Sequence, residues 1–184
     1  MGKDVSNRIN IGILFGGRSC EHEVSVTSAR SVLQAIDRDR YNICLIGIDK
    51  QGYWHTAGDI EMLTRQGEVA TLEGDTTGSP SSDIVSLEVH HEGNLASHAA
   101  QPSNIPVLDV IFPVMHGTFC EDGTIQGLFE MAGIPYVGCG VAASAIAMDK
   151  ALAKQVFNAA GIPQAPSQVV HRHLWDADVN GVLD

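Results

Sequence analysis

The densest group of chemically capable residues lies between His116 and Gly123. This stretch reads His-Gly-Thr-Phe-Cys-Glu-Asp-Gly, so an imidazole, a thiol and two carboxylates fall within eight residues. An imidazole beside carboxylates can hold a charged ligand or move protons. The same residues could serve the structure alone, with Asp122 capping a helix and Glu121 in solvent. A Cys120 nucleophile with His116 as its base would instead indicate a hydrolase, although the sequence offers no oxyanion-hole or orienting partner for it.

A second loop, Gly16 to Ser25, begins with two glycines and carries Glu21 and Glu23. Paired glycines let the backbone turn sharply and let a ligand approach it closely. The two carboxylates stand near the expected start of a helix, where they could also act only on the helix dipole. This loop alone does not distinguish a ligand site from a helix start.

A third loop, Gly138 to Ala143, formally fits the G-x-G-x-x-A fingerprint of dinucleotide-binding proteins. Such a site also requires a further strand with an acidic residue about 20 positions on. The stretch from Asp149 to Ala160 has a helical pattern instead, which argues against a nicotinamide-dependent oxidoreductase. The loop still places backbone amides at the start of a helix.

The elements that must position these loops are buried strands alternating with helices. Apolar runs predict strands at 8–15, 41–49 and 107–112, and helical periodicity predicts helices at about 24–36, 122–132 and 149–160. Strands that are apolar on both faces indicate a parallel sheet covered by helices. Each loop follows an apolar strand, a short further one in the case of the third loop, and precedes a helix. All three are therefore expected at the carboxyl edge of the sheet, where ligands bind in such folds.

Residues 57–105 interrupt this pattern. Gly, Ser, Thr, Pro and acidic residues dominate there, so we expect an insertion or a mobile region, with a hairpin around the alternating segment 85–89. His90 and His91 could suggest a metal. No carboxylate or cysteine stands at ligand spacing, so solvent-exposed imidazoles are the preferred interpretation.

Composition excludes several classes of function. The chain has 184 residues with 11 Lys and Arg against 22 Asp and Glu, a net charge of −11 that opposes nucleic acid and anionic membranes. No stretch approaches the roughly 18 apolar residues of a membrane helix. The four cysteines form no close pair typical of zinc or redox sites. We therefore expect a cytoplasmic protein with free thiols.

Taken in order, the three loops resemble the N-terminal domain of D-alanine:D-alanine ligases, enzymes of the ATP-grasp superfamily. The motifs are Gly-Gly-Arg-Ser-Cys-Glu-His-Glu-Val-Ser at 16–25, His-Gly and Glu-Asp-Gly-Thr-Ile-Gln-Gly within 116–127, and Tyr-Val-Gly through Met-Asp-Lys at 136–150. The resemblance covers residues 8–168. It implies a three-layer, Rossmann-like (pre-ATP-grasp) α/β domain at 1–165, with a parallel sheet of about four strands and a polar insertion. Residues 166–184 would be a tail where the central ATP-grasp domain begins.

The resemblance also implies the chemistry. ATP would phosphorylate the carboxylate of a first D-alanine, and the amine of a second would attack the acyl phosphate to give D-alanyl-D-alanine for peptidoglycan. Glu21 would receive the ammonium group of the first D-alanine and His116 would lie beside it, with Val24 and Ser25 also in the substrate site. Lys150 would reach the phosphates of ATP. The ligands of Mg²⁺ or Mn²⁺ are expected outside this chain, and the domain would pair into a homodimer.

The sequence departs from the family pattern in its cysteines and at its end. Cys20, Cys120 and Cys139 stand where relatives generally carry Ala, Gly and a small hydroxyl residue, and Cys120 is expected at a positive φ, at a cost of about 1 kcal/mol. After Ser167 the pattern is lost and the sequence stops at Asp184, so the chain is expected to be inactive alone. The alternative is a non-catalytic remnant that binds D-amino acids or self-associates. D-alanine and D-lactate both stay open as the second substrate.

Overall fold

The structure is a computed structural model that describes residues 8–57, 82–87, 95–97 and 106–183. The chain divides into two compact units, Met1–Ala145 and Ile146–Asp184. The first unit holds the sheet, and the second holds the helices of the last 39 residues (146 to 184). The domain boundary expected at 165 stays a prediction.

The centre of the first unit is β1 (Ile9–Gly16), which pairs in parallel with a strand on each side. These neighbours are β2 (Tyr41–Ile48) and β6 (Val110–Pro113), and an isolated parallel bridge between Ile111 and Tyr136 continues the pairing beyond β6. The parallel pairing predicted for these three strands is confirmed. The third strand begins at Val110 rather than at 107, although Leu108 before it is buried.

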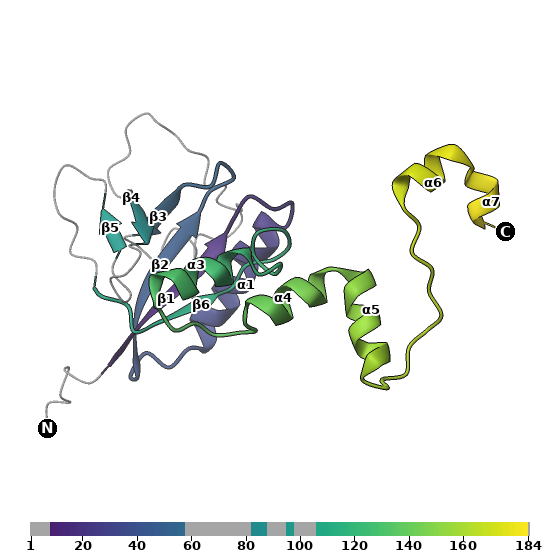
Figure 1. Ribbon diagram of the computed structural model, residues 1–184. Coiled ribbons are helices and arrows are strands. Elements are labelled where there is room, and N and C mark those ends of the chain that lie inside the picture. Colours follow the sequence, from purple (N-terminus) through teal and green to yellow (C-terminus); the bar gives the residue numbers. More distant parts are fainter. Residues whose placement is uncertain (1–7, 58–81, 88–94, 98–105, 184) are drawn as a thin grey trace, which may run out of the picture. The chain divides into compact units, whose positions relative to one another are not determined.

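Three antiparallel strands widen the sheet to six, in the order β5-β4-β3-β2-β1-β6 (Figure 1). They are β3 (Trp54–Ala57), β4 (Ser82–Leu87) and β5 (Leu95–Ser97). The antiparallel pairing of β4 with β5 confirms the hairpin expected near 85–89. The rest of the expected insertion, including His90 and His91, lies outside the described residues.

Helices cover both faces of the sheet. On one face, α1 (His22–Ala35) packs Val26, Ala29 and Leu33 against Ile13 and Phe15 of β1. On the other face, α3 (Thr124–Ala132) packs Ile125 and Phe129 against Leu14 of β1. Because successive strand residues point to opposite faces, one strand supports both helices. The three-layer α/β fold class is confirmed.

Helix ends follow the local sequence. The α3 helix stops at Gly133, whose φ of 67° is the left-handed conformation that glycine adopts readily. The α5 helix (Lys150–Ala159) begins after Asp149, whose carboxylate accepts from the amides of Ala151 and Leu152. Both predicted helices are confirmed. The remaining helices are α4 (Val141–Met148), α6 (Arg172–Ala177) and α7 (Val179–Leu183).

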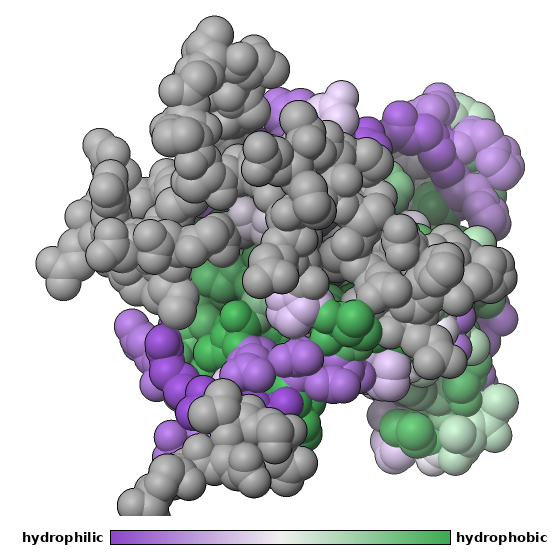
Figure 2. All heavy atoms as spheres, turned by 90° about the vertical axis from the view of Figure 1, so that its left-hand side faces the viewer, coloured by the Kyte–Doolittle hydropathy of each residue, from purple (hydrophilic) through white to green (hydrophobic). Residues whose placement is uncertain are grey.

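Two expectations from the composition concern membrane-spanning segments and the cysteines. On the side shown in Figure 2, hydrophobic residues lie near the middle of the view with hydrophilic residues next to them. Within the described ranges, no helix combines the length and the apolar character needed to cross a membrane. All four cysteines are free thiols, as expected.

Candidate functional site

The loops that follow β1 and β6 lie side by side at the carboxyl edge of the parallel strands (Figure 1). Two serine hydroxyls join them. Ser19 Oγ donates a hydrogen bond to the carbonyl of His116 at 2.7 Å, and Ser25 Oγ donates to the carbonyl of Val114 at 2.5 Å. The prediction that these two loops share one edge of the sheet is therefore confirmed.

The glycine pair at the end of β1 is a structural requirement of this turn. Gly16 and Gly17 have φ values of 86° and 103°, a region that L side chains rarely adopt. A Cβ at Gly16 would also collide with the backbone carbonyl of Ile48. The amide of Gly16 donates to Ser25 Oγ at 2.8 Å, so the turn and the helix that follows it are held together.

The Glu21 side chain is turned toward the second loop. Glu21 is exposed and occupies the N-cap position of α1, yet its carboxylate accepts no hydrogen bond from the first turn of the helix. A Cβ added at Gly117 would lie 2.6 Å from Glu21 Oε2, so the carboxylate lies against the residue that follows His116. Within the described part of the chain this carboxylate has no partner. Glu21 therefore makes no capping hydrogen bond, and its role as a ligand group, rather than as a charge acting only on the helix dipole, stays a prediction.

His116 is held at both its backbone and its ring. Ser19 binds its carbonyl, and the Oγ of Ser28 on α1 lies 3.0 Å from its Nε2. The side chain is half-buried. Glu21 and His116, predicted from separate motifs, are thus brought to the same place in the fold.

The other two predicted substrate residues differ in their surroundings. Ser25 is fully buried, and its hydroxyl is used by the backbones of Gly16 and Val114. Val24 is 52% exposed on α1. Their part in substrate binding stays a prediction, and the contacts of Ser25 indicate that it positions the two loops.

The two carboxylates of the second loop shape that loop. Asp122 accepts from the amides of Phe119 and Thr124 at 2.9 and 3.0 Å. Burial raises the pKa of Asp122, but these hydrogen bonds outweigh it and the pKa is lowered. Glu121 accepts from the amide of Gly117 at 2.7 Å. Asp122 therefore holds the amide of the first residue of α3, although Gly123 occupies the N-cap position, and Glu121 is not simply solvated.

Cys120 does not have the properties of a nucleophile. Its thiol is buried, and burial together with the charges of Asp122, Glu121 and Glu21 raises its pKa to about 12. A thiol that stays protonated at neutral pH is a poor nucleophile. The contacts therefore argue against the hydrolase alternative.

The expected positive φ at Cys120 is wrong. Among the described residues the non-glycine residue with positive φ is its neighbour Phe119, at 68°. The Phe119 ring lies under the guanidinium of Arg18, 5.4 Å from the ring centroid, and this cation–π contact offsets part of the backbone strain. The strain falls one residue earlier because the amide of Phe119 binds Asp122.

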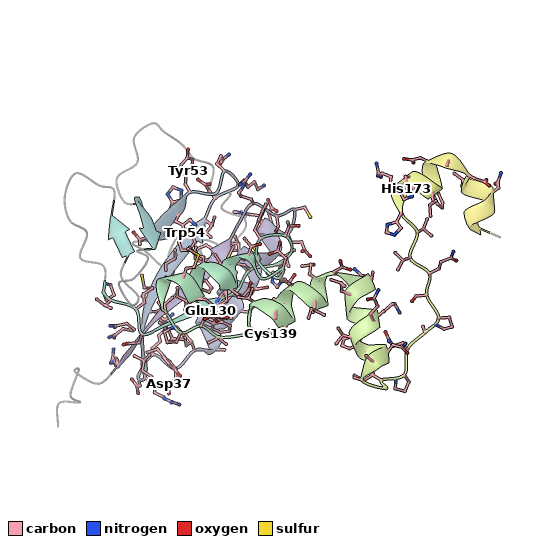
Figure 3. All side chains as sticks on the ribbon, in the orientation of Figure 1. Asp37, Tyr53, Trp54, Glu130, Cys139 and His173 are labelled. Carbon is pink, nitrogen blue, oxygen red and sulfur yellow. The ribbon has the colours of Figure 1, made fainter. Side chains whose placement is uncertain are left out.

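The third loop approaches the second one. A Cβ at Gly123 would lie 2.8 Å from the carbonyl oxygen of Val141, at the start of α4. Cys139 is exposed just before this helix, as Figure 3 shows. Helix α5 occupies the stretch where a dinucleotide site would need a strand, so the oxidoreductase alternative has no support. Lys150 is the first residue of α5 and is exposed. It belongs to the second unit.

Sequence reasoning missed the residues that hold the site. Ser19 lies within the motif at 16–25 and Ser28 lies three residues after it, and neither was predicted as a site residue. Their contacts with His116 across the sheet edge show that they hold this residue in place. The spacing of Ser25 and Ser28, three residues apart on one helix, is the signal that could have placed both on one face. In the described ranges, no group of three or more His, Cys, Asp or Glu residues could hold a metal ion.

Comparison with known proteins decides the family. The family described as D-ala D-ala ligase N-terminus matches residues 10–139. The chain belongs to this family. A D-alanine–D-alanine ligase of Kocuria rhizophila is 43% identical over 178 residues, which cover 95% of this chain and 46% of the relative. A D-alanine–D-alanine ligase of Heliobacterium modesticaldum is also 43% identical, over 95% of this chain and 45% of its own length.

Solved structures of the D-alanine ligase family share the fold. The VanG D-Ala:D-Ser ligase of Enterococcus faecalis superposes with a TM-score of 0.76 at 32% identity, over 96% of this chain and 49% of that one. The D-alanine–D-alanine ligase of Coxiella burnetii gives a TM-score of 0.73 at 30% identity, over 94% and 49%. The chain thus spans about half the length of the relatives that it matches.

Proposed function

We propose that this chain is the N-terminal half of an ATP-dependent D-alanine:D-alanine ligase that makes D-alanyl-D-alanine for peptidoglycan. Family membership supports the reaction class. The observation that carries the proposal is the Glu21 carboxylate, unpartnered among the described residues, which lies against Gly117, the residue that follows His116. A cytoplasmic location and pairing of two copies through the sheet unit belong to the same proposal.

The Glu21 carboxylate is suited to the cationic end of an amino acid. A zwitterionic D-alanine needs a fixed negative charge for its ammonium group, and charge-assisted hydrogen bonds are the strong ones. The glycine turn before Glu21 and the serine contacts of both loops fix the backbone that carries this charge. His116 lies beside the same substrate in this proposal, and Ser25 and Val24 complete the wall formed by α1.

ATP and a divalent cation complete the proposed reaction. When bound, ATP supplies the phosphoryl group that activates the first D-alanine carboxylate, and Mg²⁺ or Mn²⁺ stabilises the phosphate charge. Lys150 fits a phosphate because its ammonium group is exposed and has no ion-pair partner among the described residues. The described residues offer no metal cluster, so we assign the cation to the half of the relatives that this chain does not match.

The test is a chimera in which this chain replaces the matching half of the Kocuria rhizophila ligase. We expect D-alanine-dependent phosphate release from ATP. In this chimera Glu21→Gln keeps the shape and removes the charge, so the constant for the first D-alanine should weaken about tenfold to a hundredfold. The constant for ATP should stay the same.

Glu23→Gln is the matched control, because Glu23 lies two residues away but pairs with Lys50 at 2.5 Å instead of facing the second loop. It should leave both constants unchanged. An active chimera whose first D-alanine constant is the same with Glu21→Gln would remove Glu21 from the site. A chimera that binds D-alanine without turning over ATP would favour the non-catalytic alternative.

A further inference from the structure

Helix α1 presents a row of three polar side chains to the two loops. His22, Ser25 and Ser28 are spaced by three residues and define what we name the α1 polar row. His22 and Ser25 are completely buried, on the face that also buries Val26 and Ala29. Buried polar groups are costly without partners, so each member of the row is expected to hold something specific.

The first two members hold backbone. His22 Nδ1 lies 2.8 Å from the carbonyl of Gly17, and Ser25 Oγ joins the amide of Gly16 to the carbonyl of Val114. Both therefore fix the course of the loops. The third member differs, because Ser28 contacts a side chain rather than backbone.

Ser28 reaches across the sheet edge to the ring of His116. Its Oγ lies 3.0 Å from Nε2, and the two residues are 88 positions apart in the sequence. The hydroxyls of Thr27 and Ser31 on the same helix donate instead to helix carbonyls four residues earlier, at 3.0 and 3.3 Å. The contact of Ser28 with His116 is therefore specific to that position.

The contact leaves one ring nitrogen free. Within the described residues, His116 Nδ1 has no hydrogen-bond partner, and the residue is half-buried. The backbone of His116 is held separately by Ser19. Both restraints together hold the residue at its backbone and at its ring. The next residue in the sequence, Gly117, is the one against which the Glu21 carboxylate lies.

We propose that Ser28 is a positioning residue of the D-alanine subsite, which holds His116 by Nε2 and presents Nδ1 to the substrate. This inference rests on the proposed function, because it takes His116 as a substrate neighbour. A hydrogen bond to one ring nitrogen also selects the tautomer of the other. Ser28 does not touch the substrate in this arrangement and acts through the ring.

The first test follows the His116 ring in the 184-residue chain by long-range ¹H–¹⁵N NMR. We expect ring nitrogen signals of a single tautomer in the parent chain. Ser28→Ala should shift the Nε2 signal and mix the tautomers, Ser28→Thr should restore the parent pattern, and Ser31→Ala should leave it unchanged. Ring signals that are the same in Ser28→Ala and in the parent chain would overturn the proposal.

The second test measures kinetics in the chimera described above. Losing one hydrogen bond of ordinary strength should raise the KM for the first D-alanine about fivefold. The KM for ATP should not change, Ser28→Thr should restore the parent value, and Ser31→Ala should match it. A merely structural role would lower the melting temperature without this selective change in KM.

The two tests separate the possible failures. If Glu21→Gln weakens D-alanine binding while Ser28→Ala does not, the proposed function stands and the role of Ser28 is overturned. If neither variant affects D-alanine, the proposed substrate site itself is wrong and the inference falls with it. A changed NMR pattern with unchanged kinetics assigns Ser28 a structural role only, which also overturns the proposal.

Discussion

The residues of the candidate site divide into those with free chemical groups and those that hold them. Glu21 has an unpartnered carboxylate in the described structure, and His116 has a free ring nitrogen. Ser19 and Ser28 contribute hydroxyls that are committed to His116. Gly117 contributes the absence of a side chain, which makes room for the Glu21 carboxylate.

Gly117→Ala therefore tests the site at the scale of one residue. Gly117 has a φ of 74°, and its added Cβ would displace Glu21 Oε2. We expect the free energy of unfolding to fall by the cost of a left-handed alanine, about 1 kcal/mol, and the melting temperature to fall with it. The constant for the first D-alanine in the chimera should also weaken, about tenfold.

Gly133→Ala is the control for this prediction. Gly133 has a similar φ of 67°, but its added Cβ would meet nothing within 4 Å. It should lower the melting temperature to a similar extent and leave D-alanine binding unchanged. Equal D-alanine constants in the two variants would contradict the placement of Glu21 against Gly117.

At the scale of elements, a buried carboxylate organises the turn between β2 and β3. Asp49 is 1% exposed, and its Oδ1 accepts from the amides of Gln51, Gly52 and Tyr53 at 2.7 to 2.9 Å. Its Oδ2 lies 2.9 Å from Nε2 of His55 on β3. The turn carries the start of β3, where Figure 3 shows Tyr53 and Trp54. Arg18 of the site also lies against this turn, at Gly52.

The Asp49 turn predicts a pH dependence of stability. Burial raises the pKa of Asp49, but the hydrogen bonds from His55, Tyr53 and Gly52 outweigh it and lower the pKa below its ordinary value. Asp49 therefore takes up a proton at a higher pH in the unfolded chain than in the folded chain. The contribution of ionised Asp49 to the free energy of unfolding is present above about pH 4 and is lost as the pH falls through the pKa of the folded state. Urea unfolding between pH 7 and pH 2 measures it.

Asp49→Asn should remove that part of the pH dependence. At neutral pH it should lower the free energy of unfolding by about 1.5 to 3 kcal/mol, the range for hydrogen bonds to a charged group. At the acid end of the series the variant and the parent chain should converge. A constant difference over the whole pH range would show that the charge of Asp49 is not involved.

At the scale of the whole molecule, the proposed function makes the chain one side of a larger catalytic arrangement. It matches about half of each relative, and its described residues offer no metal cluster. Transfer of a phosphoryl group depends mainly on electrostatic stabilisation by metal ions and cationic side chains. A polypeptide of these 184 residues lacks the matching second half of its relatives.

We predict that the purified 184-residue polypeptide makes no D-alanyl-D-alanine. Incubation with ATP, Mg²⁺ and D-alanine should release no phosphate above the background without D-alanine. The chimera serves as the positive control in the same assay. D-alanine-dependent release by the polypeptide alone would place the catalytic groups within these residues.

We also predict that the polypeptide self-associates. Helix α4 consists of Val, Ala, Ser, Ile and Met residues, yet only Ser144 of it is buried. Apolar surface of this kind favours pairing of identical chains. Sedimentation at micromolar concentration should show a dimer, and a strictly monomeric profile would contradict the prediction.

The sequence by itself determined the fold class, the order of the three parallel strands and of helices α1 and α3, and the family. These follow from local patterns: apolar runs for β1, β2 and β6, the helix stop at Gly133, and the motifs around Glu21 and His116. Each pattern spans a few neighbouring residues, so the composition of a short segment is enough to predict it.

Only the tertiary structure decided how the site is assembled. The contacts of Ser28, Ser25 and Ser19 with the second loop join residues 88 to 97 positions apart, and they depend on the pairing of β1 with β6. The three antiparallel strands depend on pairing partners that are distant in the sequence. The positive φ at Phe119, rather than at Cys120, depends on the geometry of its loop. A hydroxyl in a sequence does not reveal its partner, because that partner is fixed by the register of strands that local periodicity leaves open.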